Sequence, residues 1–294
     1  MALLVFYIIT GVKPNDNSHP YFKNDNMPIK LICSADLYLC MEDYIYDNFR
    51  DLEIIFFFDD APFIKCEKHV YYVCLVSIPY VINTKQYYEY KKALIDDDND
   101  IHKLSEIART SPFLSQGSNV AFLNTEHLSN KLYLNHINKY VPSTMHIYDF
   151  SKKNTELLGK GTYIPYRNNP ISVNILKMYM KQNKRRDLCI IGHISERRKN
   201  IIDKMIDAGI CVEVIHDDFR TSRDIRAGRC KLLLNVHMHA YTNNYEAIRC
   251  ERWRFAGMPI ISETCIDKVP EGIITCDYDK ILETVKDVLR KMNN

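Results

Sequence analysis

The chain has 294 residues, a length that favours two domains over one or three. It is 46% hydrophobic and 26% charged, as is ordinary for a globular protein. Its 39 basic and 37 acidic residues leave a net charge of +2, which offers no general footprint for nucleic acid or an anionic membrane, so nucleic acid is not an expected partner.

The N-terminal run, MALLVFYIITG, is apolar but has neither the positively charged start nor the small-residue cleavage site of a signal peptide. We interpret it as a first buried strand. No run approaches the roughly 20 apolar residues that a membrane-spanning helix needs, so no membrane span is expected. The ten cysteines are scattered without a CxxC pair, which predicts reduced core thiols in a cytoplasmic protein.

The first half of the chain alternates apolar runs with polar, turn-rich pieces. Two of its apolar runs are followed by acids, Asp60 after Glu53–Phe58 and Glu126 after Val120–Leu123. Either carboxylate is a candidate general base for an acceptor hydroxyl. Strands are predicted at Leu3–Ile9, Ile29–Cys33, Glu53–Phe58, Val70–Val76, Val120–Leu123 and Met145–Tyr148, and helices at Asp36–Phe49 and Leu128–Tyr140.

A linker is predicted at Tyr163–Asn174, which contains two prolines and shows no clear periodicity. We therefore expect an N-terminal domain of residues 1–165 and a C-terminal domain of residues 166–294. The basic triplet Lys184-Arg185-Arg186 that follows is interpreted as a solvated lead-in to the next strand.

The second half alternates strands and helices regularly, which predicts a parallel sheet with crossover helices, a Rossmann-like α/β domain. In such open sheets, ligands bind at the carboxyl ends of the strands. Strands are predicted at Leu188–Ile191, Cys211–Ile215, Leu232–Val236, Ile260–Ser262 and Gly272–Cys276, and helices after Ser195 and at Ser222–Gly228, Tyr245–Phe255 and Asp279–Lys291.

The segment GHISERRK, which begins at Gly192, follows a strand and opens a helix with Ser195 as its expected N-cap. Free backbone N–H groups at this helix start, together with Arg197 and Arg198, would hold a diphosphate. Arginine in a first turn is unfavourable against the helix dipole, so two of them favour an anion site over a solvated helix start. The chain has neither a GxGxxG after this strand nor a GxxxxGK[ST], so a standard dinucleotide fingerprint or P-loop is not expected.

Polar side chains also gather where two further strands end. His216 ends one of them. The loop at this position either borders a nucleobase or ribose or is an ordinary polar loop. Asn235, His237 and His239 lie at the end of the other. The HxH pair could bind one metal, because side chains two residues apart on a strand share a face, but further ligands are not obvious. We favour a polar contact from His237 to phosphate or sugar.

The next helix is headed by Glu246. A carboxylate at this position suits the helix dipole, which is a purely structural role. It would also accept two hydrogen bonds from the hydroxyls of a ribose or a sugar, and this is the functional role that we predict for it.

These motifs together resemble a known family. The second half is similar to the donor-binding domain of GT-B-fold glycosyltransferases, such as those of large DNA viruses and some bacteria. The resemblance is carried by S-x-R-R at Ser195–Arg198, R-D-I at Arg223–Ile225, K-x-L-L-N-V-H at Lys231–His237, Y-E-A-I-R at Tyr245–Arg249 and G-M-P-I-I-S-E at Gly257–Glu263. In the first half it is carried by N-T-E-H-L at Asn124–Leu128, Y-D-F-S-K-K-N at Tyr148–Asn154 and Y-I-P-Y at Tyr163–Tyr166.

The resemblance implies two Rossmann-like domains facing a cleft, with the last helix crossing back toward the first domain. It implies a metal-independent transfer of a sugar from a UDP- or GDP-sugar to a hydroxyl acceptor on a glycan or another molecule, with no cofactor besides the donor. Glu246 would take the place of the donor-binding acid, and Arg197 and Arg198 would lie near the diphosphate. Tyr245 and Arg249, in the Y-E-A-I-R motif, are assigned to the donor site with Gly192, Ser195, His216, Asn235 and His237.

The chain departs from this pattern in one respect. Many retaining members carry two glutamates with seven residues between them before the Gly-x-Pro turn, where this chain has Asn244 and Arg252. This leaves the stereochemistry open and keeps three alternatives: a catalytically degenerate binding protein, a nucleotide-sugar epimerase, and a metal-dependent hydrolase built on the HxH pair. A viral member would act in the cytoplasm of its host.

Overall fold

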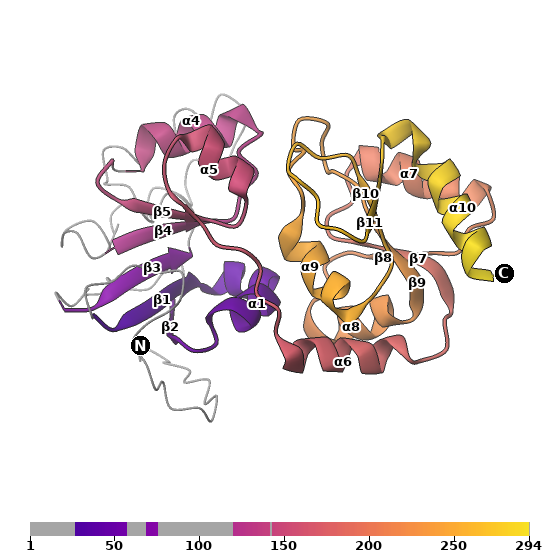
Figure 1. Ribbon diagram of the computed structural model, residues 1–294, viewed down its shortest axis with the longest axis horizontal. Helices are drawn as coiled ribbons and strands as arrows, with labels where there is room; N and C mark the ends of the chain where they lie inside the picture. The colour runs from indigo at the N-terminus through magenta and orange to yellow at the C-terminus, as the bar shows by residue number, and fades with distance from the viewer. Residues whose placement is uncertain (1–26, 58–68, 76–119, 142, 294) are drawn as a thin grey trace, which may run out of the picture. The chain divides into compact units, whose positions relative to one another are not determined.

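The computed structural model of the protein describes residues 27–57, 69–75, 120–141 and 143–293 (Figure 1). The chain divides into two compact units, Met1–Ile164 and Pro165–Asn294, one residue away from the predicted domain boundary. Each unit is described by itself below. The predicted strand Leu3–Ile9 and the candidate base Asp60 lie outside the described residues.

The first unit contains a six-stranded sheet with the strand order β2-β1-β3-β4-β5-β6, in which each neighbouring pair is parallel. Its strands are β1 (Ile29–Ser34), β2 (Glu53–Phe57), β3 (Tyr71–Leu75), β4 (Val120–Asn124), β5 (His146–Asp149) and β6 (Thr162–Tyr163). Its described helices are α1 (Ala35–Phe49), α4 (Lys131–Tyr140) and α5 (Lys152–Leu158).

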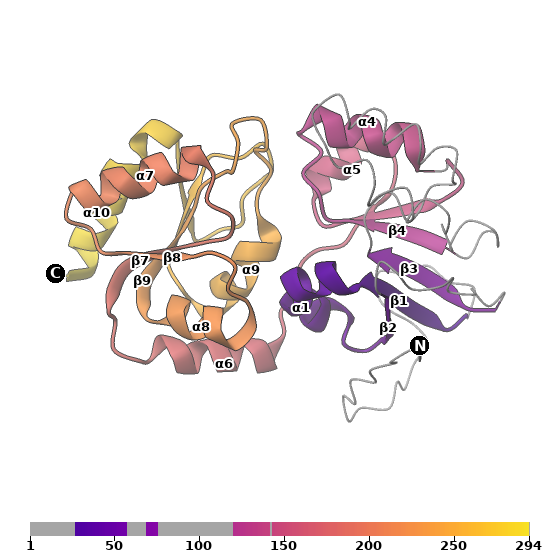
Figure 2. The same cartoon turned by 180° about the vertical axis from the view of Figure 1, so that it is seen from behind.

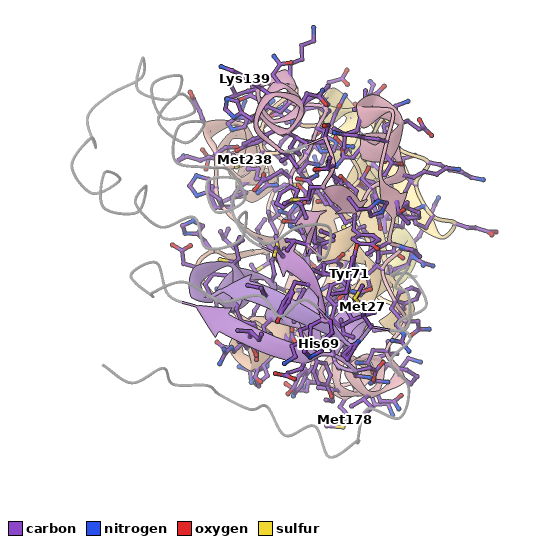
Figure 3. The ribbon with its side chains drawn as sticks, turned by 90° about the vertical axis from the view of Figure 1, so that its left-hand side faces the viewer. Met27, His69, Tyr71, Lys139, Met178 and Met238 are labelled. Atoms are coloured by element: carbon purple, nitrogen blue, oxygen red, sulfur yellow. The ribbon has the colours of Figure 1, made fainter. Side chains whose placement is uncertain are left out.

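Strands β3 and β4 are buried along their whole length, which explains why both read as continuous apolar runs. Helix α4 covers one face of the sheet, where Ile137 packs with Ile32, Phe122 and Ile147. The hydroxyl of Tyr71, labelled in Figure 3, lies 3.4 Å from that of Tyr148, so the two buried phenols form a hydrogen bond. The strands and helices predicted in the described part of this unit are confirmed to within a few residues.

The second unit contains a five-stranded, fully parallel sheet with the order β11-β10-β9-β7-β8. Its strands are β7 (Arg186–Ile191), β8 (Val212–Ile215), β9 (Cys230–Asn235), β10 (Ile260–Glu263) and β11 (Ile273–Cys276). Its helices are α6 (Pro170–Met180), α7 (Glu196–Asp207), α8 (Arg220–Gly228), α9 (Ala247–Ala256) and α10 (Ile281–Asn293), with a short 3-10 turn, η2 (Tyr278–Lys280), before the last.

Helices cover both faces of this second sheet (Figure 2). Successive side chains of a strand point to opposite faces. On β9, Leu232 and Leu234 therefore pack under α7 and α10, whereas Leu233 packs under α6, α8 and α9. Helix α10, which the resemblance places across to the first domain, packs on this sheet through Ile281 and Val285. The predicted α/β class with parallel sheets is confirmed in both units.

One element contradicts the sequence prediction. The predicted linker, Tyr163–Asn174, contains the start of helix α6, which begins at Pro170 with Asn169 as its N-cap. Asn169 Oδ1 accepts a hydrogen bond of 3.1 Å from the amide of Ile171. Proline is tolerated at the first helical position, where its missing N–H costs nothing, so Pro170 starts a helix here.

Within the described residues, no helix is both long and apolar enough to cross a bilayer.

Candidate functional site

The candidate site lies at the carboxyl ends of β7, β9 and β10. The register pairs Cys189 with Leu233, and Leu234 with Ile261, so these three parallel strands end at the same edge of the sheet. The chain leaves that edge at Gly192, just after β7. It is the edge at which open α/β sheets bind ligands.

Gly192 makes room for two guanidinium groups. Its φ of +108° lies in a backbone region that residues other than glycine rarely adopt. A Cβ built on Gly192 would lie 3.1 Å from Nη2 of Arg249 and 3.5 Å from Nη1 of Arg198. The glycine therefore allows the backbone turn and the close approach of both arginines.

Arg198 is held rigidly inside the site. Its Nε donates to the carbonyl of Val236 at 2.8 Å and its Nη1 to the carbonyl of His193 at 2.7 Å. Nη2 has no hydrogen-bond partner among the described residues, although the side chain is only 2% exposed. Burial, and then the charge of Arg249, lower the pKa of Arg198 to about 9. A buried cation with an unused donor is suited to an anionic ligand.

Arg249 is aligned by an amide. Its Nη1 donates to Oδ1 of Asn235 at 2.8 Å, and Nδ2 of Asn235 donates to the hydroxyl of Ser262 at 3.0 Å. Asn235 is fully buried, so its orientation is fixed by these two bonds. The end of β9 thus positions a guanidinium that belongs to α9.

Glu246 lies at the N-cap of α9, but its side chain makes no capping hydrogen bond to the described amides of that helix. Its charge nevertheless lies at the amino end of the helix, where it suits the helix dipole. Its Oε1 lies 3.4 Å from Nη1 of Arg249 and 4.0 Å from Nη2 of Arg198. The carboxylate is 15% exposed and lies beside the two guanidinium groups.

Arg197 is paired with a different carboxylate. Its guanidinium forms a bidentate ion pair with Glu263, the last residue of β10, and lies 3.7 Å above the ring centroid of Tyr278. Glu263 also accepts a hydrogen bond of 3.0 Å from the amide of His237. Arg197 therefore ties α7 to β10 in this structure.

Tyr245 and His237 are directed into the protein. The hydroxyl of Tyr245 donates to Glu251 at 2.8 Å, and burial raises the pKa of this phenol. The ring of His237 is buried, with Nε2 3.1 Å from the carbonyl of Thr264. His239, the other member of the HxH pair, stacks on Tyr241 at 5.0 Å between ring centroids. The two histidines thus make different contacts.

Ser195 is the N-cap of α7, as predicted: its Oγ accepts from the amide of Arg198 at 3.3 Å. The same hydroxyl donates to the carbonyl of Met238 at 2.7 Å, which fastens the helix start to the loop after β9. Beside it, Nε2 of His216 lies 3.2 Å from Nδ1 of His193, so the ends of β8 and β7 are joined by an exposed pair of imidazoles.

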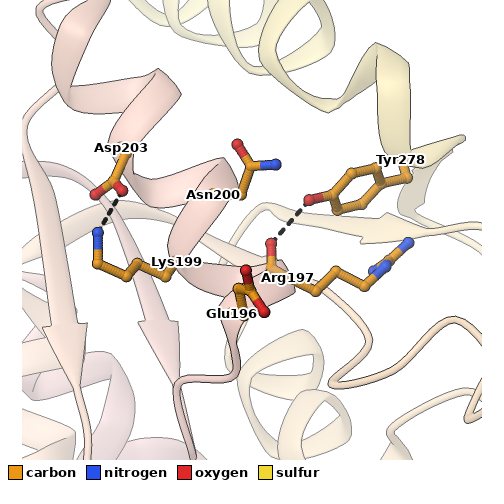
Figure 4. Close-up of a pocket in the computed structure, with 6 residues that line it drawn as sticks. All are labelled: Glu196, Arg197, Lys199, Asn200, Asp203 and Tyr278. Carbon is orange, nitrogen blue, oxygen red and sulfur yellow. Dashed lines mark hydrogen bonds and ion pairs between the residues drawn. The ribbon is translucent and has the colours of Figure 1, made fainter.

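A hollow of about 540 Å³ lies next to this edge, between the first turns of α7 and the turn η2 (Figure 4). Its charges balance, because two acids face two bases, and one pair, Lys199 and Asp203, is an ion pair. The hydroxyl of Tyr278 donates to the carbonyl of Arg197 at 2.8 Å across one end. It is lined by Glu196, Arg197, Lys199, Asn200, Asp203 and Tyr278.

In the first unit, the candidate base Glu126 is exposed just after β4. Its backbone carbonyl accepts hydrogen bonds from Nδ2 of Asn124 at 3.0 Å and of Asn154 at 2.8 Å. Both amides also donate to the buried Asp149. This network gives the N-T-E-H-L and Y-D-F-S-K-K-N motifs a structural role, because it joins the ends of β4 and β5.

No cluster of three or more histidine, cysteine or acidic side chains suited to a metal ion occurs in the part of the chain that the structure describes. Two residues of the site were not assigned a role from the sequence. Glu263 and His193 both lie at or just after the carboxyl end of a parallel strand. Their position at the end of a predicted parallel strand is the sequence feature by which both could have been identified.

The structure thus brings Gly192, Arg198, Asn235, Glu246 and Arg249 together, and it pairs Arg197, Tyr245 and His237 with other groups. Two guanidiniums and one carboxylate therefore lie together at this edge, and the forked donors of a guanidinium match the oxygens of a phosphate group.

Relatives of the chain occur in a giant virus. The chain is 33% identical over 209 residues to uncharacterized protein L140 of Acanthamoeba polyphaga mimivirus, and the match covers 68% of each protein. The chain belongs to the family of this viral protein. It is also 28% identical over 295 residues to uncharacterized protein L137 of the same virus, a match that covers 94% of this chain.

The chain spans 36% of the length of L137. It also matches 20% of uncharacterized protein L138 of that virus, at 35% identity over 179 residues and 58% of this chain. Both relatives therefore contain long regions without a counterpart here.

No model of a known protein family matches the chain. Among solved structures, a GsuK mutant is 10% identical with a TM-score of 0.23, and GsuK bound to ADP is 9% identical with a TM-score of 0.22. The matches cover 93% and 92% of this chain and 72% of each GsuK chain. Scores this low carry no argument about fold or function.

Proposed function

We propose that the protein is a GT-B-type glycosyltransferase that moves a sugar from a UDP- or GDP-sugar to a hydroxyl on a glycan or another acceptor. The supporting observation is the unused donor of the buried Arg198 next to Arg249, opposite Glu246, at the carboxyl edge of a parallel sheet. The viral relatives and the motif resemblance are compatible with this activity, which would take place in the cytoplasm of an infected cell.

In this proposal, Arg198 and Arg249 bind the diphosphate of the donor. Glu246 accepts hydrogen bonds from hydroxyls of the ribose or the sugar. The acceptor oxygen forms a bond to the anomeric carbon while the bond from that carbon to the diphosphate oxygen breaks. The two guanidiniums offset the charge that develops on the leaving nucleoside diphosphate, so the chemistry needs no metal ion.

The proton of the acceptor hydroxyl must pass to a base. If the transfer inverts the anomeric centre, that base comes from the first unit, with Glu126 and Asp60 as the candidates. Glu126 is exposed and follows a parallel strand, a position from which a carboxylate can reach a substrate.

The first experiment is a thermal-shift screen of the full chain with UDP, GDP, CMP and their common sugar conjugates. A ligand at about 100 times its dissociation constant stabilises the native state by about 2.7 kcal/mol. One nucleoside diphosphate should raise the melting temperature, and Arg249→Gln should lose that shift. Lys204→Gln, which removes an exposed cation from α7, should keep it.

A turnover assay with the identified donor then tests Glu246. Glu246→Ala should abolish transfer and weaken donor binding, because the hydroxyl ligand is removed while the arginines remain. Full activity in Glu246→Ala would overturn the assignment. Conversion of the donor without any acceptor would indicate an epimerase instead.

A catalytically inactive nucleotide-binding protein is the second candidate, and one observation favours it. The positions where retaining relatives carry their two glutamates hold Asn244, which is fully buried, and Arg252, whose Nη1 donates to Asp224 at 3.1 Å. Both therefore lie inside the protein. Nucleotide binding without transfer across a panel of donors and acceptors would support this second candidate.

A further inference from the structure

A second basic site lies at the opposite, amino-terminal side of the same sheet. Arg185 and Arg186 stand at the start of β7, and Arg229 immediately precedes β9. With Arg226 from α8 and Glu213 from β8 they line a cavity of about 230 Å³, called here the arginine cavity. Four cations therefore face one carboxylate.

Glu213 and Asp218 are paired with two of the four arginines, and a third nearby acid, Asp187, is paired with Lys231. Glu213 accepts from Nε of Arg226 at 2.7 Å and from Nε of Arg186 at 3.3 Å. Arg226 also donates from Nη1 to Asp218 at 3.0 Å and from Nη2 to the carbonyl of Val214 at 2.8 Å. Two arginines and two acids cancel, and the charges of the other two arginines are left over.

Those two arginines, Arg185 and Arg229, keep donors available. Arg229 uses Nε for Gln182 at 3.0 Å, and neither its terminal nitrogens nor the guanidinium of Arg185 has a partner among the described residues. Their backbones are nevertheless fixed, because the amide of Arg185 donates to the carbonyl of Arg229 at 2.9 Å. The excess charge is thus attached to an ordered part of the sheet.

Neighbouring groups strengthen the positive field. Nζ of Lys184 donates to the carbonyl of Gly228 at 2.8 Å, which places a fifth cation beside the cavity. Nη1 of Arg186 lies 3.1 Å from the sulfur of Cys211, an exposed cysteine. The positive charges of these side chains repel one another. An anion that accepts hydrogen bonds from several of them relieves that repulsion.

We propose that the arginine cavity is an anion site that binds a single phosphate or pyrophosphate group. Its volume of about 230 Å³ lies below the ~300–1,000 Å³ of ordinary small-molecule pockets, so it suits one such group better than a whole nucleotide sugar. The forked donors of arginine match the oxygen geometry of phosphate. The basic triplet that begins at Lys184 is then part of a binding site as well as a lead-in to β7.

The proposal is independent of the proposed transferase activity, because the two sites lie at opposite ends of the strands. The thiol of Cys211 provides a readout that pyrophosphate bound near Arg249 would not affect. The full chain is treated with iodoacetamide with and without pyrophosphate, and the rate of modification at Cys211 is followed by peptide mass spectrometry. Cys40, exposed in the first unit, serves as the internal control.

Pyrophosphate at about four times its dissociation constant leaves about one fifth of the arginine cavities unoccupied. Modification of Cys211 should therefore slow about fivefold, and modification of Cys40 should not change. The double variant Arg185→Gln/Arg229→Gln should lose this protection. The matched variant Lys286→Gln/Lys291→Gln, which removes two exposed cations from α10, should retain it. Absence of protection of the unmodified chain by both pyrophosphate and phosphatidic acid vesicles, or equal protection in the first double variant, would overturn the proposal.

The phosphate group could be free or carried by a lipid, and two further arms separate these sources. Protection by pyrophosphate in solution identifies a soluble anion. Protection by phosphatidic acid vesicles, but not by phosphatidylcholine vesicles or free pyrophosphate, identifies a lipid headgroup. Protection by single-stranded RNA alone would contradict a site for a single phosphate group.

Discussion

Gly192 is the residue on which the candidate donor site most directly depends. Replacement with alanine forces a side chain into a backbone with a φ of +108° and adds a Cβ 3.1 Å from the guanidinium of Arg249. We expect Gly192→Ala to lower the free energy of unfolding by about 1–2 kcal/mol, the usual cost of a left-handed backbone, and to abolish nucleotide binding. Chemical denaturation and thermal shifts would measure the two effects.

Gly209 offers a matched control. It has a φ of +76°, but no described atom lies within 4 Å of its Cβ position. Gly209→Ala should therefore show a similar loss of stability and bind nucleotide normally. If both variants lose binding equally, the loss reflects backbone strain and not the approach of the two arginines.

Arg198 predicts a pH dependence of ligand binding. Its pKa, lowered to about 9 mainly by burial, should rise when an anion pairs with it, so binding takes up a proton above that pH. The dissociation constant of a nucleoside diphosphate should increase as pH rises through 9, approaching about tenfold per pH unit. Calorimetric titrations between pH 8 and pH 10.5 would measure this, and the dependence should be weaker for Arg198→Gln, in which only the titration of the nucleobase remains.

The lowered pKa of Arg198 also makes the stability of the folded state depend on pH. The folded state holds this proton less tightly than the unfolded chain, so the contribution of Arg198 to stability is constant below pH 9 and rises with pH above it. A ligand that pairs with Arg198 should reduce this rise.

The sequence predicts which residues gather at the edge of the sheet, but not which way they point. Gly192, Asn235 and Glu246 could be located because strand ends and helix starts are visible in the pattern of apolar and polar residues. The direction of Arg197 depends on Glu263, 66 residues later in the chain. A partner that distant is not readable from local spacing.

At the scale of elements, the packing of α6 against α8 depends on Gly228. A Cβ there would lie 2.7 Å from Cβ and 2.9 Å from the backbone carbon of Tyr179, closer than side chains are found in practice. Alanine would gain about 1 kcal/mol of helix propensity over glycine. The overpacking cost of about 1–3 kcal/mol exceeds this gain, because the backbone of α6 must move.

We therefore expect Gly228→Ala to destabilise the second unit by up to about 2 kcal/mol in denaturant unfolding. Thr221→Ala, at an exposed position of the same helix, should change stability by less than about 0.5 kcal/mol. An increase in stability for Gly228→Ala would show that the two helices can separate at no cost.

Helix α6 also shows why one element was missed from sequence. Its inner face carries Val173 and Leu176, but its outer face carries Ile171, Ile175 and Met178, and the last of these is 62% exposed (Figure 3). Apolar residues on both faces remove the 3.6-residue contrast on which a helix prediction depends. The remaining signal was Asn169 before Pro170, a cap followed by a helix-starting proline.

At the scale of the whole molecule, the second unit has its own sheet and two packed faces. All five residues gathered at the candidate donor site belong to it. We expect a fragment of residues 165–294 to unfold cooperatively and to bind the same nucleoside diphosphate as the full chain, within about a factor of three in affinity, since interactions confined to one independent unit are largely additive.

If the transfer inverts the anomeric centre, the fragment should nevertheless transfer no sugar, because the candidate bases lie in the first unit. Circular dichroism and calorimetry would check folding and binding. A folded fragment that does not bind nucleotide would contradict the location of the donor site within the second unit.

The sheet edges of both units bear on how the protein behaves when it is concentrated. Unpaired edge strands attract strands of other molecules and promote aggregation. The edge strand β6 has only two residues, and β8 and β11 have four each. On β8, the carbonyl of Val214 is already taken by Arg226. The fourth edge strand, β2, has five residues. The three shorter edges offer little template for strand addition, which should help the protein to remain dispersed at high concentration.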